Sequence, residues 1–197
     1  MIIHRKKLIV IAPPRCASRY LRATLKPDID LPGATAGTML QTKEYREVWR
    51  EYQKVGVVRD VVDRFLSSYG YLSGKVPDLE EIKHRGEPGN IIQSLTNRFL
   101  DLYPTALDAA EKMEELRKRP VYGPFFWDFP TFFGEAGVDT LLYVPDLPTP
   151  PSKCEFSIPL KASPELEALV RPHCLRTLPA GSWLEILTKE GVAELLS

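Results

Sequence analysis

Arg59 and Ser67 are the residues of this chain whose types and spacing best suit the binding of a phosphate; they lie in the segment VGVVRDVVDRFLSSY, residues 55–69. The planar guanidinium of Arg59 can donate two parallel hydrogen bonds to a pair of phosphate oxygens. The hydroxyl of Ser67 is a further donor. The alternative is that Arg59 pairs with a carboxylate and that Ser67 is only a small packing residue.

The elements around these two residues would place them at one end of a sheet. The valine-rich run 55–58 is typical of a buried parallel strand. Asp60 can cap a following helix, with Asp63 at its third position. We therefore expect the strand to stop near Arg59, at the edge where open α/β sheets bind ligands, and Ser67 to lie about two turns into the helix.

A second segment, LIVIAPPRCASRYLRATL (residues 8–25), predicts a strand, a tight basic loop and a helix beginning near Ser18. The first N–H groups of a helix have no partner within it and favour an anion, as does the helix dipole. We expect Arg15 and five consecutive backbone N–H groups to converge on an anion there: those of Cys16, Ala17, Ser18, Arg19 and Tyr20. No glycine precedes Gly33, so the glycine-rich phosphate loop of ordinary nucleoside triphosphatases is absent.

Together the two segments resemble the sulfotransferases that use 3′-phosphoadenosine 5′-phosphosulfate (PAPS), in particular the carbohydrate-type branch. The first loop of that family reads roughly P-K-x-G-[ST]-[ST]-x-L, where this chain has PRCASRYL. The second family motif reads R-D-P-x-x-R-x-x-S-x-Y, where this chain has RDVVDRFLSSY. Five residues of the second motif are in register: Arg59, Asp60, Arg64, Ser67 and Tyr69.

The resemblance implies a single sulfotransferase-like domain over residues 1–197, a three-layer α/β fold with a central parallel sheet of the P-loop nucleotide kinase type. It implies transfer of a sulfuryl group from PAPS to a hydroxyl or amine of a small-molecule or carbohydrate acceptor, leaving adenosine 3′,5′-bisphosphate. Arg59 and Ser67 would bind the 3′-phosphate of the donor. Arg15 and residues 16–20 would bind the 5′-phosphosulfate, with Arg15 in the catalytic place of the family's lysine, which helps neutralise the bridging oxygen as sulfate leaves.

The chain departs from the family pattern at four positions. Arg15 keeps the charge of the family's lysine without its compact ammonium. Ala17 replaces a glycine, which predicts backbone angles that need no glycine. Arg19 replaces a hydroxyl residue, and Val61 replaces the proline that follows Arg-Asp.

The general base of the family, a His or Glu between the two motifs, has no evident counterpart in this chain. No histidine lies in the interval, and its carboxylates are those of Asp28, Asp30, Glu44, Glu47 and Glu51. The three glutamates fall on the polar side of a predicted helix, residues 42–52, where a solvated face is the default. Asp30 and Glu44 are weak candidates for the base. A noncatalytic nucleotide-binding relative is therefore an alternative.

A cysteine phosphatase is a second alternative. Cys16, near Arg15 and a helix start, could have a lowered thiol pKa, and Arg22 completes the spacing C-x-x-x-x-x-R. The loop has no glycine, however, and two prolines precede the cysteine, so an inert thiol is the default. The three cysteines, Cys16, Cys154 and Cys174, have no metal-ligand spacing. They predict no disulfide or zinc site and favour a reduced, intracellular setting.

Composition agrees with a small soluble enzyme: the chain has 197 residues, of which 44% are hydrophobic. Its 26 basic and 26 acidic residues balance, which argues against nucleic-acid binding as the main task. The apolar run from Leu8 to Ala12 is too short for a signal peptide or a membrane span. We therefore expect a cytoplasmic protein with no membrane contact; no oligomeric state follows from the sequence.

Further elements are expected along the rest of the chain. A strand is predicted near residues 138–144 and an extended loop over 145–159. Helices are predicted near residues 91–102 and at three cap signals: Thr105 with Asp108, Ser163 with Pro164, and Ser182 with Glu185. The aromatic stretch from Tyr122 to Phe133 is expected to pack onto the sheet as an irregular segment, with stacking on an acceptor as the alternative.

Overall fold

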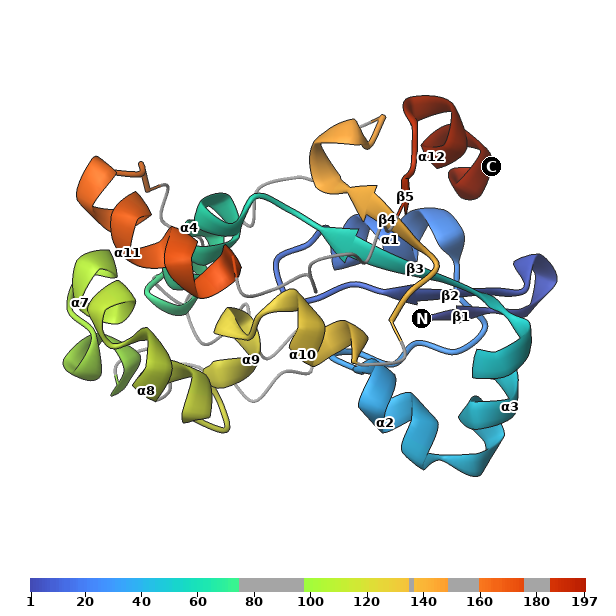
Figure 1. Cartoon of the computed structure of the whole chain (residues 1–197), viewed down its shortest axis with the longest axis horizontal. Helices are drawn as coiled ribbons and strands as arrows, with labels where there is room; N and C mark the ends of the chain where they lie inside the picture. The colour runs from blue at the N-terminus through green and yellow to red at the C-terminus, as the bar shows by residue number, and fades with distance from the viewer. Residues whose placement is uncertain (75–97, 135–136, 149–159, 176–184) are drawn as a thin grey trace, which may run out of the picture.

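The computed structural model of the chain describes residues 1–74, 98–134, 137–148, 160–175 and 185–197. A five-stranded sheet with the strand order β1-β2-β3-β4-β5 forms its centre (Figure 1). The strands are β1 (Ile2–Ile3), β2 (Leu8–Ile11), β3 (Gln53–Val58), β4 (Thr140–Tyr143) and β5 (Glu185–Ile186). Neighbouring strands from β2 to β5 are parallel, whereas β1 is antiparallel to β2. The mixed α/β class expected from the sequence is therefore confirmed.

The expectation of a purely parallel sheet is wrong at the β1 edge. Between β1 and β2 lies only the short 3-10 helix η1 (His4–Lys6), followed by Lys7 in the left-handed region at φ 48°. A parallel pair needs a long crossover connection, so a connection this short allows only an antiparallel pair. With two residues each, β1 and β5 are also too short to have been recognised from hydrophobic periodicity.

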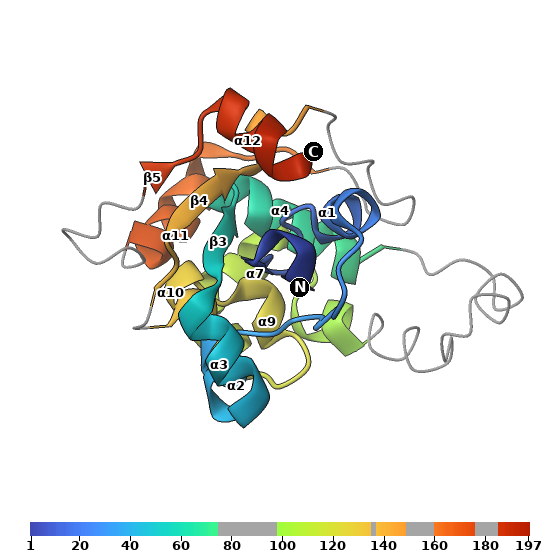
Figure 2. The same ribbon diagram turned by 90° about the vertical axis from the view of Figure 1, so that its right-hand side faces the viewer.

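Most of the helices lie toward one of two ends of the sheet. Figure 1 shows α4, α7, α8, α9 and α11 together beyond the carboxyl end of β3, while α2 and α3 lie toward the opposite end. The helices are α1 (Ser18–Leu25), α2 (Ala36–Gln41), α3 (Lys43–Glu51), α4 (Val61–Leu72), α7 (Ala106–Glu111), α8 (Met113–Lys118), α9 (Gly123–Phe126), α10 (Phe129–Phe133), α11 (Pro164–Leu175) and α12 (Lys189–Leu196). A second 3-10 helix, η2 (Val144–Asp146), follows β4. Figures 1 and 2 both show α12 beside β4 and β5.

Two hydrophobic clusters form the core, and α4 joins them. The first, which we call the sheet cluster, contains the buried side chains of β1 to β4 together with α1, α2 and α10. The second, the helical cluster, contains Val62, Phe65 and Leu66 of α4 packed against α7, α8, α9 and α11. Val61, the first residue of α4, packs against both clusters. The position of α4 at the end of β3 is therefore fixed by apolar packing from two sides.

Most of the elements expected from the sequence are present. Three strands and the helices beginning near Ser18, Thr42, Asp60, Thr105 and Ser163 are confirmed. Thr105 and Asp108 form the expected capping box, and Ser163 Oγ accepts from Leu166 N–H at 3.2 Å. The aromatic stretch of residues 122–133 forms α9 and α10, with five rings at most 6% exposed: Tyr122, Phe126, Phe129, Phe132 and Phe133. Only the rings of α10 pack in the sheet cluster as expected, whereas Tyr122 and Phe126 belong to the helical cluster.

The helix predicted from Ser182 with Glu185 is wrong. Glu185 lies in β5, and the last helix begins only at Lys189. Thr188 caps that helix by accepting from Gly191 N–H at 3.2 Å. Glu185 and Ile186 instead pair with Thr140 and Leu141 of β4, so their backbone groups are satisfied by the sheet. Residues 91–97, Ser182 and residues 149–159 of the expected loop lie outside the described residues; residues 98–102 are helical.

Of the helices that the structure describes, none combines the length and the apolar character needed to cross a bilayer.

Replacing Gly56 in β3 by alanine should destabilise the protein. The added Cβ would lie 2.7 Å from Phe133 Cζ and 2.9 Å from Val138 Cγ2, and both side chains are at most 5% exposed. We expect G56A to lower the free energy of unfolding by about 1–3 kcal/mol in urea denaturation. The control G37A, whose Cβ meets only Thr35 Oγ1 at 3.5 Å in α2, should raise it by up to about 1 kcal/mol. Equal stabilities of the two variants would contradict this packing.

Candidate functional site

The two segments singled out in the sequence meet at one end of the sheet, where β2 and β3 terminate. β2 and β3 are adjacent and parallel, with Ile11 opposite Gly56, so both chains leave the sheet at the same end. β2 leads into the loop of residues 12–17, which we call the basic loop, and then into α1. β3 ends at Val58 and leads through Arg59 and Asp60 into α4. The predicted placement of Arg59 at a strand end is confirmed.

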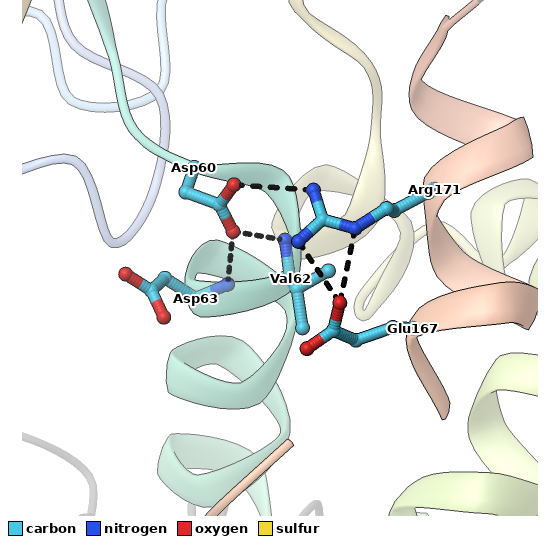
Figure 3. A network of polar contacts seen from close by, with 5 residues as sticks. All are labelled: Asp60, Val62, Asp63, Glu167 and Arg171. Atoms are coloured by element: carbon cyan, nitrogen blue, oxygen red, sulfur yellow. Dashed lines mark hydrogen bonds and ion pairs between the residues drawn. The ribbon is translucent and has the colours of Figure 1, made fainter. Parts of the chain in front are cut away.

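Asp60 caps α4 as expected. Its Oδ1 accepts from Val62 N–H at 3.0 Å and from Asp63 N–H at 3.1 Å. Figure 3 shows that its other oxygen faces Arg171 of α11, whose Nη1 lies 3.5 Å away. Arg171 also binds Glu167 at 3.0 Å. The carboxylate beside Arg59 is thus held by the helix N–H groups and by a second arginine.

Arg59 is directed at the basic loop instead of at a carboxylate. It is half-buried, and its Nη1 donates to Arg15 O at 3.5 Å. Within the described part of the chain, Arg59 makes no ion pair. The alternative reading, in which Arg59 pairs with a carboxylate, therefore finds no partner there.

Arg15 and Ser67 are in direct contact. Arg15 Nε donates to Ser67 Oγ at 3.1 Å, and its guanidinium lies over the ring of Tyr71 at 4.9 Å from the ring centroid. Ser67 and Tyr71 are one helical turn apart on α4, so they share a face of the helix. Residues 52 positions apart in the sequence are therefore in contact, which the sequence did not predict, since the resemblance assigned Arg15 and Ser67 to opposite ends of the donor.

The backbone of the basic loop is more constrained than expected. Ala17 has φ 55° and ψ 20°, and Arg15 has φ 67°, both in the left-handed region that favours glycine. The expectation that Ala17 needs no glycine-like angles is wrong. Six residues, 12–17, separate the end of β2 from the start of α1, and the chain turns between them through these two left-handed residues. Left-handed non-glycine residues are uncommon and concentrate at functional sites.

Part of the expected set of N–H donors is available. The first hydrogen bond within α1 runs from Leu21 N–H to Ala17 O, so the N–H groups of Ser18, Arg19 and Tyr20 precede it. Cys16 N–H instead donates to Pro13 O at 3.0 Å, because the loop closes a tight turn there, and its predicted role in binding an anion is not supported. Among the side chains, that of Arg19 is exposed and those of Ser18 and Tyr20 are half-buried.

Arg64 holds the basic loop through a hydrogen bond to one of its carbonyls, a role that the sequence did not assign. Its guanidinium is buried, with 6% of the residue exposed, and its Nε donates to Pro14 O at 3.2 Å. Its Nη1 donates to the carbonyl of Trp127, and the guanidinium lies against the rings of Phe129 and Phe132. The sequence feature that could have indicated this role is the position of Arg64 in the second motif, on the face of α4 turned toward the sheet.

Tyr69, also in the second motif, has a structural role. Burial raises its pKa to about 12, and its hydroxyl donates to Tyr103 O at 3.0 Å.

The environment of Cys16 does not suit a nucleophile. Its side chain is fully buried, and this burial raises the pKa of the thiol, although Arg64, Arg59 and Arg15 act to lower it. The lowered thiol pKa that the phosphatase alternative requires is therefore not found, because removal from water outweighs the nearby charges. Arg22 binds Asp30 at 2.8 Å instead of facing a substrate of Cys16. Neither residue supports the phosphatase alternative.

The carboxylates considered as bases are engaged or distant. Asp30 pairs with Arg22, and Asp28 accepts from His4 N–H at 2.7 Å. The three glutamates, Glu44, Glu47 and Glu51, are exposed on α3, which leads into the amino end of β3, whereas the basic loop lies at the carboxyl end. In the described ranges, no group of three or more His, Cys, Asp or Glu side chains is arranged to hold a metal ion.

Comparisons with protein-family models, with curated proteins and with solved structures returned no match to this chain.

Replacing Ala17 by glycine should stabilise the protein. The left-handed backbone at φ 55° costs an alanine about 1 kcal/mol or more, and glycine removes this cost. The greater flexibility that glycine gives to the unfolded chain offsets part of the gain. We expect A17G to raise the free energy of unfolding by about 0.5 kcal/mol in urea denaturation. The control A168G, at an exposed position within α11, should lower it by about 1 kcal/mol. Similar losses in both variants would contradict the left-handed angle.

Replacing Arg64 by lysine should destabilise the protein although the charge is kept. A lysine lacks the planar guanidinium with which Arg64 reaches the carbonyls of both Pro14 and Trp127. One of these buried carbonyls therefore loses its donor. We expect a loss of about 2–4 kcal/mol in the free energy of unfolding. The control R46K, on an exposed arginine that binds Leu40 O, should change it by less than about 0.5 kcal/mol. A loss in R64K no larger than in R46K would remove the supporting role of Arg64.

Proposed function

We propose that this protein binds PAPS and transfers its sulfuryl group to a hydroxyl or amine of a small-molecule or carbohydrate acceptor, on a three-layer fold of the P-loop nucleotide kinase type. The observation that carries the proposal is the contact of Arg15 with Ser67 and of Arg59 with the Arg15 carbonyl. They support the proposal because residues proposed for both ends of the donor lie close together, beyond the carboxyl ends of β2 and β3. Binding at the carboxyl ends of parallel strands is typical of open α/β sheets.

The electrostatics of the site favour a polyanion. Three guanidinium groups, those of Arg15, Arg59 and Arg64, lie near enough to Cys16 to influence its pKa. Asp60, the adjacent carboxylate, is bound by helix N–H groups and by Arg171. The N–H groups at the start of α1 add further positive partial charge. A ligand with a phosphate at one end and a phosphosulfate at the other suits this distribution.

The proposed mechanism is positioning together with electrostatic stabilisation. Arg59 and Ser67 would hold the 3′-phosphate, and the N–H groups of Ser18, Arg19 and Tyr20 would hold the phosphosulfate. Arg15 would release its hydrogen bond to Ser67 and bind the donor. There it would stabilise the negative charge that develops on the leaving phosphate oxygen as the acceptor attacks sulfur in line. The acceptor proton would pass to a base that the described residues do not identify.

A binding function without catalysis is the second candidate. It is favoured by the state of the five carboxylates between the two motifs, which are paired, bonded or exposed at the other end of the sheet. The two candidates share the donor site and differ in turnover. Binding of adenosine 3′,5′-bisphosphate without detectable sulfuryl transfer from PAPS to a panel of hydroxyl and amine acceptors would favour the second.

Removal of the Arg59 side chain tests the donor site. In calorimetric titrations, we expect the wild-type protein to bind adenosine 3′,5′-bisphosphate in preference to 5′-AMP and ATP. R59A should weaken the bisphosphate by roughly tenfold to a hundredfold, because it removes hydrogen bonds to a charged phosphate. It should weaken 5′-AMP, which lacks the 3′-phosphate, by less than about threefold.

The matched control is R50A, which removes an exposed arginine from α3 and should leave both affinities unchanged. S67A should act in the same direction as R59A with a smaller effect, of about threefold to tenfold. Equal losses of bisphosphate and 5′-AMP in R59A would remove the 3′-phosphate assignment. Absence of bisphosphate binding by the wild-type protein would remove the donor site altogether.

A further inference from the structure

The ring of Tyr71 lies beside Arg15 of the candidate site and has no place in the functions proposed so far. It is half-buried and lies on α4 one turn beyond Ser67. The ring stacks on Phe125 of α9, with ring centroids 5.6 Å apart and an interplanar angle of 26°. The guanidinium of Arg15 lies over it at 4.9 Å. Tyr71 is thus an oriented aromatic surface that a planar cation already occupies.

That cation is the group most affected by a bound anion. Arg15 Nε donates to Ser67 Oγ at 3.1 Å, so the serine hydroxyl keeps its proton for a phosphate oxygen, and the charge of that phosphate attracts the neighbouring guanidinium. As Arg15 turns to the ligand, the ring surface that it covers becomes available. Guanidinium groups and nucleic-acid bases are both planar and stack on aromatic rings in the same manner. A base can therefore replace the guanidinium on Tyr71.

The spacing along α4 fits a single nucleotide. Side chains four residues apart on a helix are neighbours, with their Cβ atoms about 6 Å apart. The 3′-phosphate and the base of a nucleoside bisphosphate are substituents of one ribose ring and are separated by a comparable distance. A phosphate held by Ser67 and Arg59 leaves the base within reach of Tyr71, whereas a ligand without a base leaves the ring unused.

We infer that Tyr71, backed by Phe125, is the platform on which the base of the bound nucleotide stacks, and that it determines the preference of the site for a purine nucleotide over other polyanions. The inference rests on the proposed donor site, since it takes Ser67 and Arg59 as the anchor of the 3′-phosphate. It assigns to α4 the recognition of two parts of the ligand, the phosphate through Ser67 and the base through Tyr71.

The test compares ligands with and without a base. Calorimetric titrations would use adenosine 3′,5′-bisphosphate and its abasic counterpart, 1-deoxyribose 3,5-bisphosphate, with the wild-type protein, Y71L and Y71F. We expect Y71L to weaken the adenosine ligand about tenfold, the loss typical of one base–aromatic stack, and to leave the abasic ligand within about twofold. Y71F keeps the ring and should bind both ligands like the wild-type protein.

A measurement on the wild-type protein alone gives a second test that needs no variant to fold. The affinity should fall in the order adenosine, cytidine and abasic 3′,5′-bisphosphate, because a purine offers the largest stacking surface. Equal losses of both ligands in Y71L would mean that Tyr71 only positions Arg15 and would overturn the inference, as would equal affinities of the three ligands for the wild-type protein. If the wild-type protein binds none of them, the proposed donor site fails; if it binds them without regard to the base, only the role of Tyr71 fails.

Discussion

The buried guanidinium of Arg64 joins three parts of the molecule that are far apart in the sequence. It extends from α4, donates to the carbonyl of Pro14 in the basic loop and to that of Trp127 before α10, and lies against the rings of α10. A charged group this deeply buried is tolerated only where fixed acceptors replace water. The loop carbonyl and the aromatic rings therefore have to stay where the guanidinium needs them, which ties the basic loop and the segment before α10 to α4.

The strain in the basic loop follows from the same constraint. The loop must leave β2, bring its carbonyl to Arg64 and enter α1 within a few residues, and it does so with Arg15 and Ala17 in the left-handed region. Strained backbone persists where the surroundings over-determine it. The burial of Cys16 between these two residues supplies that support and at the same time removes its thiol from reactive chemistry, since burial raises the thiol pKa.

Within the candidate site, the residues are linked to one another through Arg15. Arg15 contacts both Ser67 and Tyr71, and its carbonyl accepts from Arg59. A ligand that engages one of these residues therefore changes the environment of the others. On the opposite side of the α4 terminus, Arg171 holds Asp60 and Glu167, so the only carboxylate next to Arg59 in sequence is kept in its capping role. The arrangement leaves positive charge facing the basic loop and negative charge facing α11.

The sequence by itself determined the local features: the end of β3 before Arg59, the cap at Asp60, the start of α1 at Ser18 and the capping box of Thr105 with Asp108. Each depends on residues within a turn of one another, so short-range rules suffice. Only the tertiary structure decided that Ala17 is left-handed, that Cys16 is buried, that β1 and β5 pair at the sheet edges, and that Arg15 binds Ser67. These features depend on contacts between residues far apart in the chain, where packing and desolvation outweigh local preference. A pattern of residue types records neither.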